Sequence, residues 1–105
     1  MSSDYRLVFV TASSPDEADK ISLALVKEKL AACVNIAPKI TSRYRWQGKI
    51  ETANESLLII KTKKSLIPKL VARVKTLHSY SVPEVIAFPI LEGNPDYLKW
   101  IKESI

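Results

Sequence analysis

The stretch from Ser56 to Thr62 constrains the fold more than any other part of the sequence. Its centre, Leu57-Leu58-Ile59-Ile60, is apolar without alternation. A strand with one buried face alternates apolar and polar side chains, so this run predicts a central strand that is covered on both faces. The chain has 105 residues, the size of one domain. We therefore expect a single domain over residues 1–105, with its core built around this strand.

A strand and a helix are predicted before this run. Tyr5–Thr11 is rich in β-branched and aromatic residues, which favour a strand. Ser14 can cap the helix that follows, Pro15 suits its first position, and the Glu17 carboxylate can reach back to the cap amide. The helix is expected from 15 to about 31. Its apolar residues lie on two arcs, which predicts burial on more than one side.

A long hairpin is predicted to lead into the central strand. Residues 33–46 are typical of a strand that Pro38 interrupts. Tyr44 and Trp46 share one of its faces. Gln47-Gly48 marks a tight reversal, after which residues 49–52 run back.

The last third of the chain predicts a helix, a strand and a short helix. Ser65 can cap the second helix, whose apolar residues from Ile67 to His78 follow i, i+3, i+4 spacing. Residues 84–91 resemble a strand, and Pro89 within it lacks an amide donor, which indicates an edge position or a bulge. Residues 93–96 then open a short third helix.

The order of these elements predicts an α+β fold of the ferredoxin-like βαββαβ type, with a C-terminal helix. This fold has an antiparallel sheet with both main helices on one face. The other face is left uncovered, and 47% of the residues are hydrophobic, a high share for so small a chain. We therefore expect the small third helix, together with further copies of the chain, to bury the second face.

Composition excludes several classes of function. Lys and Arg outnumber Asp and Glu by 16 to 11, and the excess gathers in residues 37–49 and 61–75. Such basic segments are either solvated faces or phosphate-binding surfaces, but the central strand has no aromatic residue for base stacking, so no nucleic-acid partner is expected. Two glycines cannot build a dinucleotide fingerprint or a P-loop. No acid, base and nucleophile constellation emerges, so no enzyme is expected.

Cysteine usage and hydropathy bear on the compartment. The single Cys33 excludes an intramolecular disulfide and a zinc ribbon built from one chain. No apolar run approaches the roughly 20 residues that span a bilayer, and no targeting segment is evident. We expect a cytoplasmic protein with no membrane partner.

Three residues are candidate metal ligands, and each has a structural alternative. Cys33 is either a small buried hydrophobe or a thiolate ligand. His78, the only histidine, is either a partly buried structural residue or a metal ligand. Glu84 follows Pro83 and is either an ordinary edge carboxylate or a ligand.

Five segments in order resemble the CutA divalent-cation tolerance family: Leu30–Pro38, Thr41–Glu51, Ile60–Thr62, His78–Ile86 and Gly93–Ile101. The resemblance implies a ferredoxin-like subunit in a tight homotrimer, with long hairpins that reach neighbouring subunits. It also implies tolerance to copper and other divalent ions, and an architecture similar to PII signalling proteins, whose clefts between subunits hold small molecules. In bacterial members copper binding is linked to a Cys near the end of the first strand and to a His pair, of which only His78 is matched here.

Two functions follow. In the first, His78, with Cys33 or Glu84 from the same or an adjacent subunit, binds a divalent cation such as Cu(II). In the second, the protein has no metal role and is a PII-like sensor or scaffold, whose clefts between subunits bind a small anionic metabolite or nothing. The residues expected to line those clefts are Tyr44, Trp46, Lys61 and Glu84.

Overall fold

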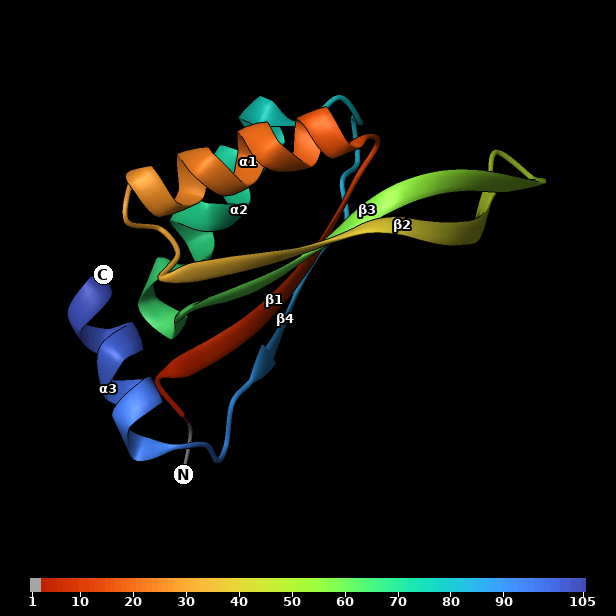
Figure 1. The fold of residues 1–105 in the computed structure, drawn as a ribbon. Coiled ribbons are helices and arrows are strands. Elements are labelled where there is room, and N and C mark those ends of the chain that lie inside the picture. Colours follow the sequence, from red (N-terminus) through yellow and green to blue (C-terminus); the bar gives the residue numbers. More distant parts are fainter. Residues whose placement is uncertain (1–2) are drawn as a thin grey trace.

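The apolar run lies within the sheet of the computed structural model, which describes residues 3–105. The described elements are β1 (Tyr5–Ala12), α1 (Pro15–Lys27), β2 (Cys33–Trp46), β3 (Lys49–Lys63), a 3-10 turn (Lys64–Leu66), α2 (Ile67–Leu77), β4 (Val85–Pro89) and α3 (Pro95–Ser104). Within residues 3–105 the sheet has the order β2-β3-β1-β4, and every neighbouring pair is antiparallel. Figure 1 shows α1 and α2 together on one side of this sheet. The α+β prediction with four antiparallel strands and three helices is confirmed.

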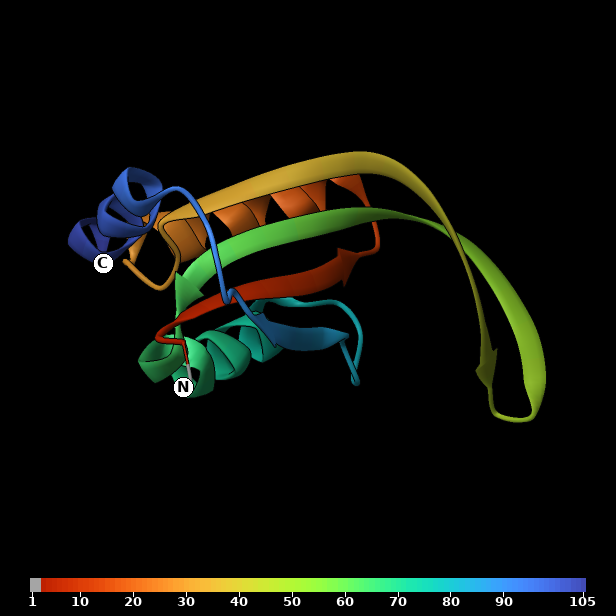
Figure 2. The same ribbon diagram turned by 90° about the horizontal axis from the view of Figure 1, so that it is seen from below.

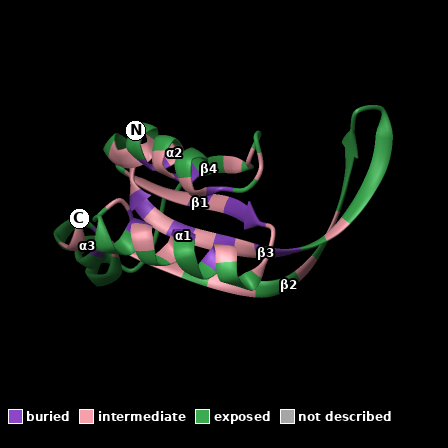
Figure 3. Ribbon diagram, turned by 90° about the horizontal axis from the view of Figure 1, so that it is seen from above, coloured by how far each residue is buried: buried purple, intermediate pink, exposed green. Residues whose placement is uncertain are grey.

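The core lies between these two helices and one face of the sheet. From β3 the alternate residues Leu58 and Ile60 point into it, and both are fully buried. Ile21 and Leu25 of α1 are equally buried against them. Figure 3 shows the resulting buried strip along the centre of the sheet, beneath the exposed outer surface of α1. Alternate residues of a strand point to opposite faces, so β3 places its other apolar side chains on the far side.

The far side of the sheet, which we call the open sheet face, is not fully covered within one chain. It consists of Leu7, Phe9, Leu57, Ile59, Ile86 and Phe88, as the strand register places them on one face. Ile86 is 46% exposed and Phe88 is 41% exposed. Leu57 and Ile59 of the central strand are half-buried on this face, so one chain provides only part of the cover that was predicted for its second side.

The end of α1 differs from the prediction. The helix stops at Lys27, four residues before the expected end, and Lys29 adopts φ of 60°. The Leu30 amide donates to the Leu25 carbonyl at 2.9 Å, and the Lys29 amide donates to the Val26 carbonyl at 3.1 Å. These two bonds form the motif that usually ends a helix with glycine. A lysine in that position gives no sequence signal, which explains the error.

Burial of α1 is also narrower than expected. Ala18, Ile21 and Leu25 are buried, but Leu23 on the second arc is 68% exposed. Only one apolar stripe of α1 is therefore covered within the chain.

Two further details correct the predicted boundaries. Ser65 lies within the 3-10 turn and does not cap α2, whose preceding residue Leu66 makes no side-chain cap hydrogen bond among residues 3–105. Pro38 does not break β2 but coincides with a shift in its pairing with β3 between Ala37 and Ile40. The strand expected at 84–91 is shorter, Val85–Pro89, and lies at the sheet edge as Pro89 indicated.

The β2–β3 hairpin extends far beyond the rest of the sheet. Gln47 and Gly48 both have positive φ, 50° and 78°, as a tight two-residue hairpin turn requires. Figure 2 shows the hairpin curving away from the body, with α3 at the opposite end of the molecule. This curvature brings the inner face of the hairpin toward the loop that precedes β4.

Candidate functional site

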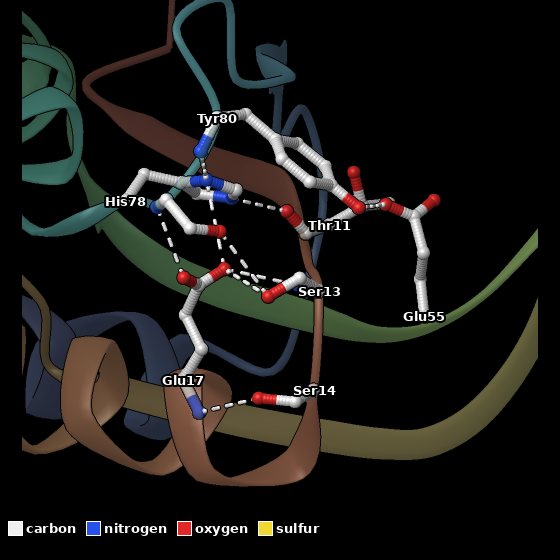
Figure 4. A network of polar contacts seen from close by, with 8 residues as sticks. Thr11, Ser13, Ser14, Glu17, Glu55, His78 and Tyr80 are labelled. Carbon is white, nitrogen blue, oxygen red and sulfur yellow. Dashed lines mark hydrogen bonds and ion pairs between the residues drawn. The ribbon is translucent and has the colours of Figure 1, made fainter.

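A polar network joins the start of α1 to the end of α2. The Ser14 hydroxyl accepts from the Glu17 amide at 3.1 Å, as a helix cap should. The Glu17 carboxylate accepts from the Ser13 amide at 2.9 Å, not from the cap amide as expected. It also accepts from the Ser79 amide at 2.9 Å, and Figure 4 shows it between the two segments. Glu17 therefore fixes the end of α2 against the end of β1.

The environment of Glu17 lowers the pKa of its carboxyl. Partial burial acts to raise this pKa, but hydrogen bonds from Ser13 and Ser79 stabilise the charged form and outweigh burial. The Glu17 side chain is only 12% exposed. The carboxylate is thus held in its ionised form by donors from both segments.

His78 is a buried structural member of this network. Its side chain is fully buried, Nε2 lies 2.7 Å from the Thr11 carbonyl, and Nδ1 lies 3.0 Å from the Tyr80 amide. An amide can only donate, so Nδ1 accepts, and Nε2 carries the proton that it donates to Thr11. Both ring nitrogens are therefore engaged by the backbone in the neutral tautomer.

Tyr80 and Glu55 form the outer part of the network. The Tyr80 hydroxyl donates to Glu55 Oε2 at 2.8 Å, which links the β4 approach loop to the base of the hairpin. Burial, together with the hydrogen bond and negative charge of Glu55, raises the pKa of Tyr80 to about 12. Glu55 is only 6% exposed. Tyr80 is therefore a neutral donor, and Glu55 is held at the floor of the space beside it.

That space is a cavity of about 600 Å³ between the hairpin and the β4 approach loop. Tyr44 and Trp46 line it from β2, Glu55 from β3, and Tyr80 and Glu84 from the loop. Three of the four residues expected in a cleft, Tyr44, Trp46 and Glu84, thus lie around one cavity of a single chain. The fourth, Lys61, does not line it.

Lys61 and Cys33 lie together at the other end of the sheet. They are paired across β2 and β3, and the Lys61 ammonium donates to Asn35 Oδ1 and lies 4.0 Å from Cys33 Sγ. The helix α3 packs against β3 at this end, where burial, and then the neighbouring Cys33, raises the pKa of Tyr97.

The three candidate metal ligands are not brought together. Thr11, which His78 contacts, is paired with Leu57, whereas Cys33 is paired with Lys61. Four residues along a strand separate these positions by roughly 13 Å. Across residues 3–105 no three side chains of His, Cys, Asp or Glu form a group that suits a metal ion. Glu84 lies with the cavity, apart from Cys33.

Glu17, Glu55 and Tyr80 are the functional residues that sequence reasoning did not select. Glu17 was expected only as a cap partner, and Glu55 lies in the segment before the apolar run, where it resembles a solvent-facing carboxylate. The sequence does place Glu55 on the same strand face as Leu57 and Ile59, since the three residues are spaced by two. This spacing does not reveal its hydrogen-bond partner Tyr80, which lies 25 residues away.

These features define a class of small α+β proteins. They are the long hairpin, the split βαβ sheet and the buried polar network at the helix ends. Residues 6–104 match the family model described as CutA1 divalent ion tolerance protein. The chain belongs to the CutA family, as its sequence segments indicated.

Relatives and solved structures agree with this assignment. A divalent-cation tolerance protein CutA of Thermus thermophilus is 52% identical over 98 residues, covering 93% of this chain and 95% of that protein. The chloroplastic protein CutA 1 of Oryza sativa is 50% identical over 93% of this chain, which spans only 55% of that relative. Among solved structures, CutA of Xylella fastidiosa has a TM-score of 0.95 at 46% identity, with 98% of this chain and 99% of that chain covered.

A periplasmic divalent cation tolerance protein CutA of Archaeoglobus fulgidus has a TM-score of 0.93 at 41% identity, with coverage of 95% and 97%. The compartments in these names differ between relatives. In the part of this chain that the structure describes, no helix combines the length and the apolar character needed to cross a bilayer.

Replacing Glu17 with Gln should make the free energy of unfolding less dependent on pH in the acid range. The lowered pKa means that Glu17 stabilises the fold above its unfolded pKa, and that this contribution is lost as pH falls through the folded pKa. At pH 7 we expect Glu17→Gln to lower the free energy of unfolding by roughly 1 kcal/mol. Denaturant unfolding from pH 7 to pH 3 should show a shallower decline for the variant than for the wild type.

The matched control is Glu103→Gln on α3, whose side chain is 65% exposed beside Lys99. It should leave both the stability and its pH dependence close to those of the wild type. Equal acid dependence in Glu17→Gln and the wild type would contradict the role given to Glu17.

Proposed function

We propose that this protein acts in divalent-cation tolerance as a non-catalytic homotrimer that holds a small ligand in the cavity beside Tyr80. The observation that carries this proposal is the cavity itself. About 600 Å³ lies within the range of roughly 300–1,000 Å³ for small-molecule sites. Aromatic side chains and carboxylates converge on it, and the Glu17 and His78 network fixes one wall.

The wall of the cavity that carries Tyr80 is already ordered within a single chain, which favours a ligand-binding role for this cavity. Tyr80 is fixed by its hydroxyl on Glu55 and by its amide on His78. A ligand therefore meets groups that are already ordered, and less conformational entropy is lost on binding. We place this activity in the cytoplasm, in agreement with a single free cysteine.

Self-association is supported by the open sheet face. Phe88 contacts Phe9 in an edge-to-face arrangement with ring centroids 5.2 Å apart, and Ile86 lies beside them on β4. A contiguous apolar patch of this kind on a small chain is typical of an interface. The number of three subunits follows from the resemblance to the CutA family.

A divalent metal ion such as Cu(II) is the second candidate ligand. The names of the relatives favour it, since several are called divalent-cation tolerance proteins. His78 is disfavoured as a ligand because both ring nitrogens already have backbone partners. In this alternative Cys33 and Glu84 serve separate ions or meet ligands from neighbouring subunits.

Phe88→Glu should dissociate the trimer, because a buried charge without a partner is strongly unfavourable in an apolar interface. Native mass spectrometry should show a three-chain species for the wild type and single chains for the variant. Ile86→Lys is a second variant of the same surface, and circular dichroism shows whether each variant is folded. Leu23→Glu, on the outer side of α1, is the matched control and should stay trimeric; dissociation in this control would overturn the assignment of the interface.

Trp46→Leu should abolish ligand binding in the cavity. A ligand-observed NMR screen of cationic, neutral and anionic small molecules should find binders for the wild type, and these should be lost because the variant removes an aromatic wall. Trp100→Leu on α3 is the matched control, since Trp100 is exposed and does not line the cavity. The cavity proposal fails if no binder is found, or if both variants lose binding equally.

His78→Gln should leave the binding of Cu(II) unchanged. Glutamine retains a donor for the Thr11 carbonyl, so the fold is expected to persist. Calorimetric titration of CuCl2 into the wild type and the variant should give the same stoichiometry and affinity. Loss of copper binding in a folded His78→Gln variant would restore His78 as a metal ligand.

A further inference from the structure

Carboxylates outnumber cations among the residues that line the cavity, although the whole chain carries +5. Glu55 lies at the floor and Glu84 at the rim. The one cationic residue among the lining groups is Arg43, which pairs across the hairpin with Thr52. Its Nε donates to Thr52 Oγ1 at 3.4 Å. This bond holds the Arg43 side chain toward Thr52, and the two carboxylates outnumber this single cation around the cavity.

Glu55 has one oxygen that is free for a ligand. Oε2 accepts from Tyr80, whereas Oε1 has no hydrogen-bond or ion-pair partner among residues 3–105. Every fully enclosed side-chain oxygen or nitrogen of residues 3–105 has a hydrogen-bond partner. Because Oε1 has none, it is not fully enclosed, and Glu55 lines the cavity although the residue as a whole is only 6% exposed. A carboxylate oxygen so placed can only accept, so it selects a donor.

Aromatic side chains line the same cavity. Tyr44 and Trp46 remain 41% and 48% exposed on the hairpin. Tyr80 lines the cavity from the loop, and Figure 4 shows its hydroxyl at the Glu55 carboxylate. Aromatic faces attract cations within about 6 Å of the ring centroid. Tyr80 stays a neutral phenol because burial and Glu55 raise its pKa to about 12. Aromatic walls with carboxylates at the floor and rim form a setting for a cation with an apolar stem.

We propose that the cavity binds a primary alkylammonium group, whose N–H donors reach Glu55 Oε1 and the Glu84 carboxylate while its methylene chain lies between Trp46 and Tyr80. This inference rests on the proposed function, because it names the ligand class of the same cavity. An anionic metabolite is disfavoured, since Lys61, the cation expected for it, lies at the other end of the sheet.

The test compares two probes of equal chain length on the intact assembly. n-Butylammonium and butyrate are titrated at one ionic strength into protein labelled with 15N, and the indole signals of Trp46 and Trp100 are followed. The ammonium should shift the Trp46 signal and leave Trp100 unchanged, whereas butyrate should shift neither. Glu55→Gln keeps an acceptor for Tyr80 and should weaken ammonium binding about 10- to 100-fold, the usual effect of losing a hydrogen bond to a charged group.

The control is Glu103→Gln, which removes one negative charge far from the cavity and should bind n-butylammonium like the wild type. Binding of butyrate that strengthens in Glu55→Gln overturns the ammonium proposal and leaves the cavity as a ligand site. If neither probe binds and Trp46→Leu changes the oligomeric state, a second copy of the chain occupies the space. That result overturns both the ligand class and the proposed function of the cavity.

Discussion

One-sided burial of β3 is the constraint on which the rest of the structure depends. Leu58 and Ile60 are sealed beneath α1 and α2, whereas Leu57 and Ile59 point to a face that one chain covers only in part. Complete burial of an apolar side chain is worth about 1.5–3 kcal/mol, so a strand that is apolar on both sides strongly favours a second cover. The same strand that forms the core therefore also supports the proposed assembly.

The polar network has the complementary task of fixing the ends of the elements around that core. Glu17 and His78 join the end of β1 to the start of α1 and the end of α2, and they hold the segment that carries Tyr80. Both ring nitrogens of the neutral His78 are hydrogen-bonded to the backbone, which explains why the histidine can lie in a buried position. It orders a wall of the cavity instead of offering a nitrogen to solvent.

Much of this fold could be predicted from the sequence, since hydrophobic patterning and turn residues report local structure. The long hairpin, the edge position of Pro89 and the two core helices follow from such patterns. The end of α1 could not be predicted, because Lys29 replaces the usual glycine. Tyr44, Trp46 and Glu84 could be selected for a cleft. Glu55 and Tyr80 could not, because their hydrogen bond joins segments that only the tertiary fold brings together.

Hydroxyl-radical footprinting of the wild-type assembly tests the central claim most directly, because it reads the accessibility of individual side chains. Covering of the open sheet face by other copies predicts that Ile86 and Phe88, exposed in one chain, react as little as buried Leu58. Leu23 on α1 and Trp46 in the cavity should react readily. Reaction of Phe88 at a rate close to that of Leu23 would contradict the account, since the face would then be open to solvent.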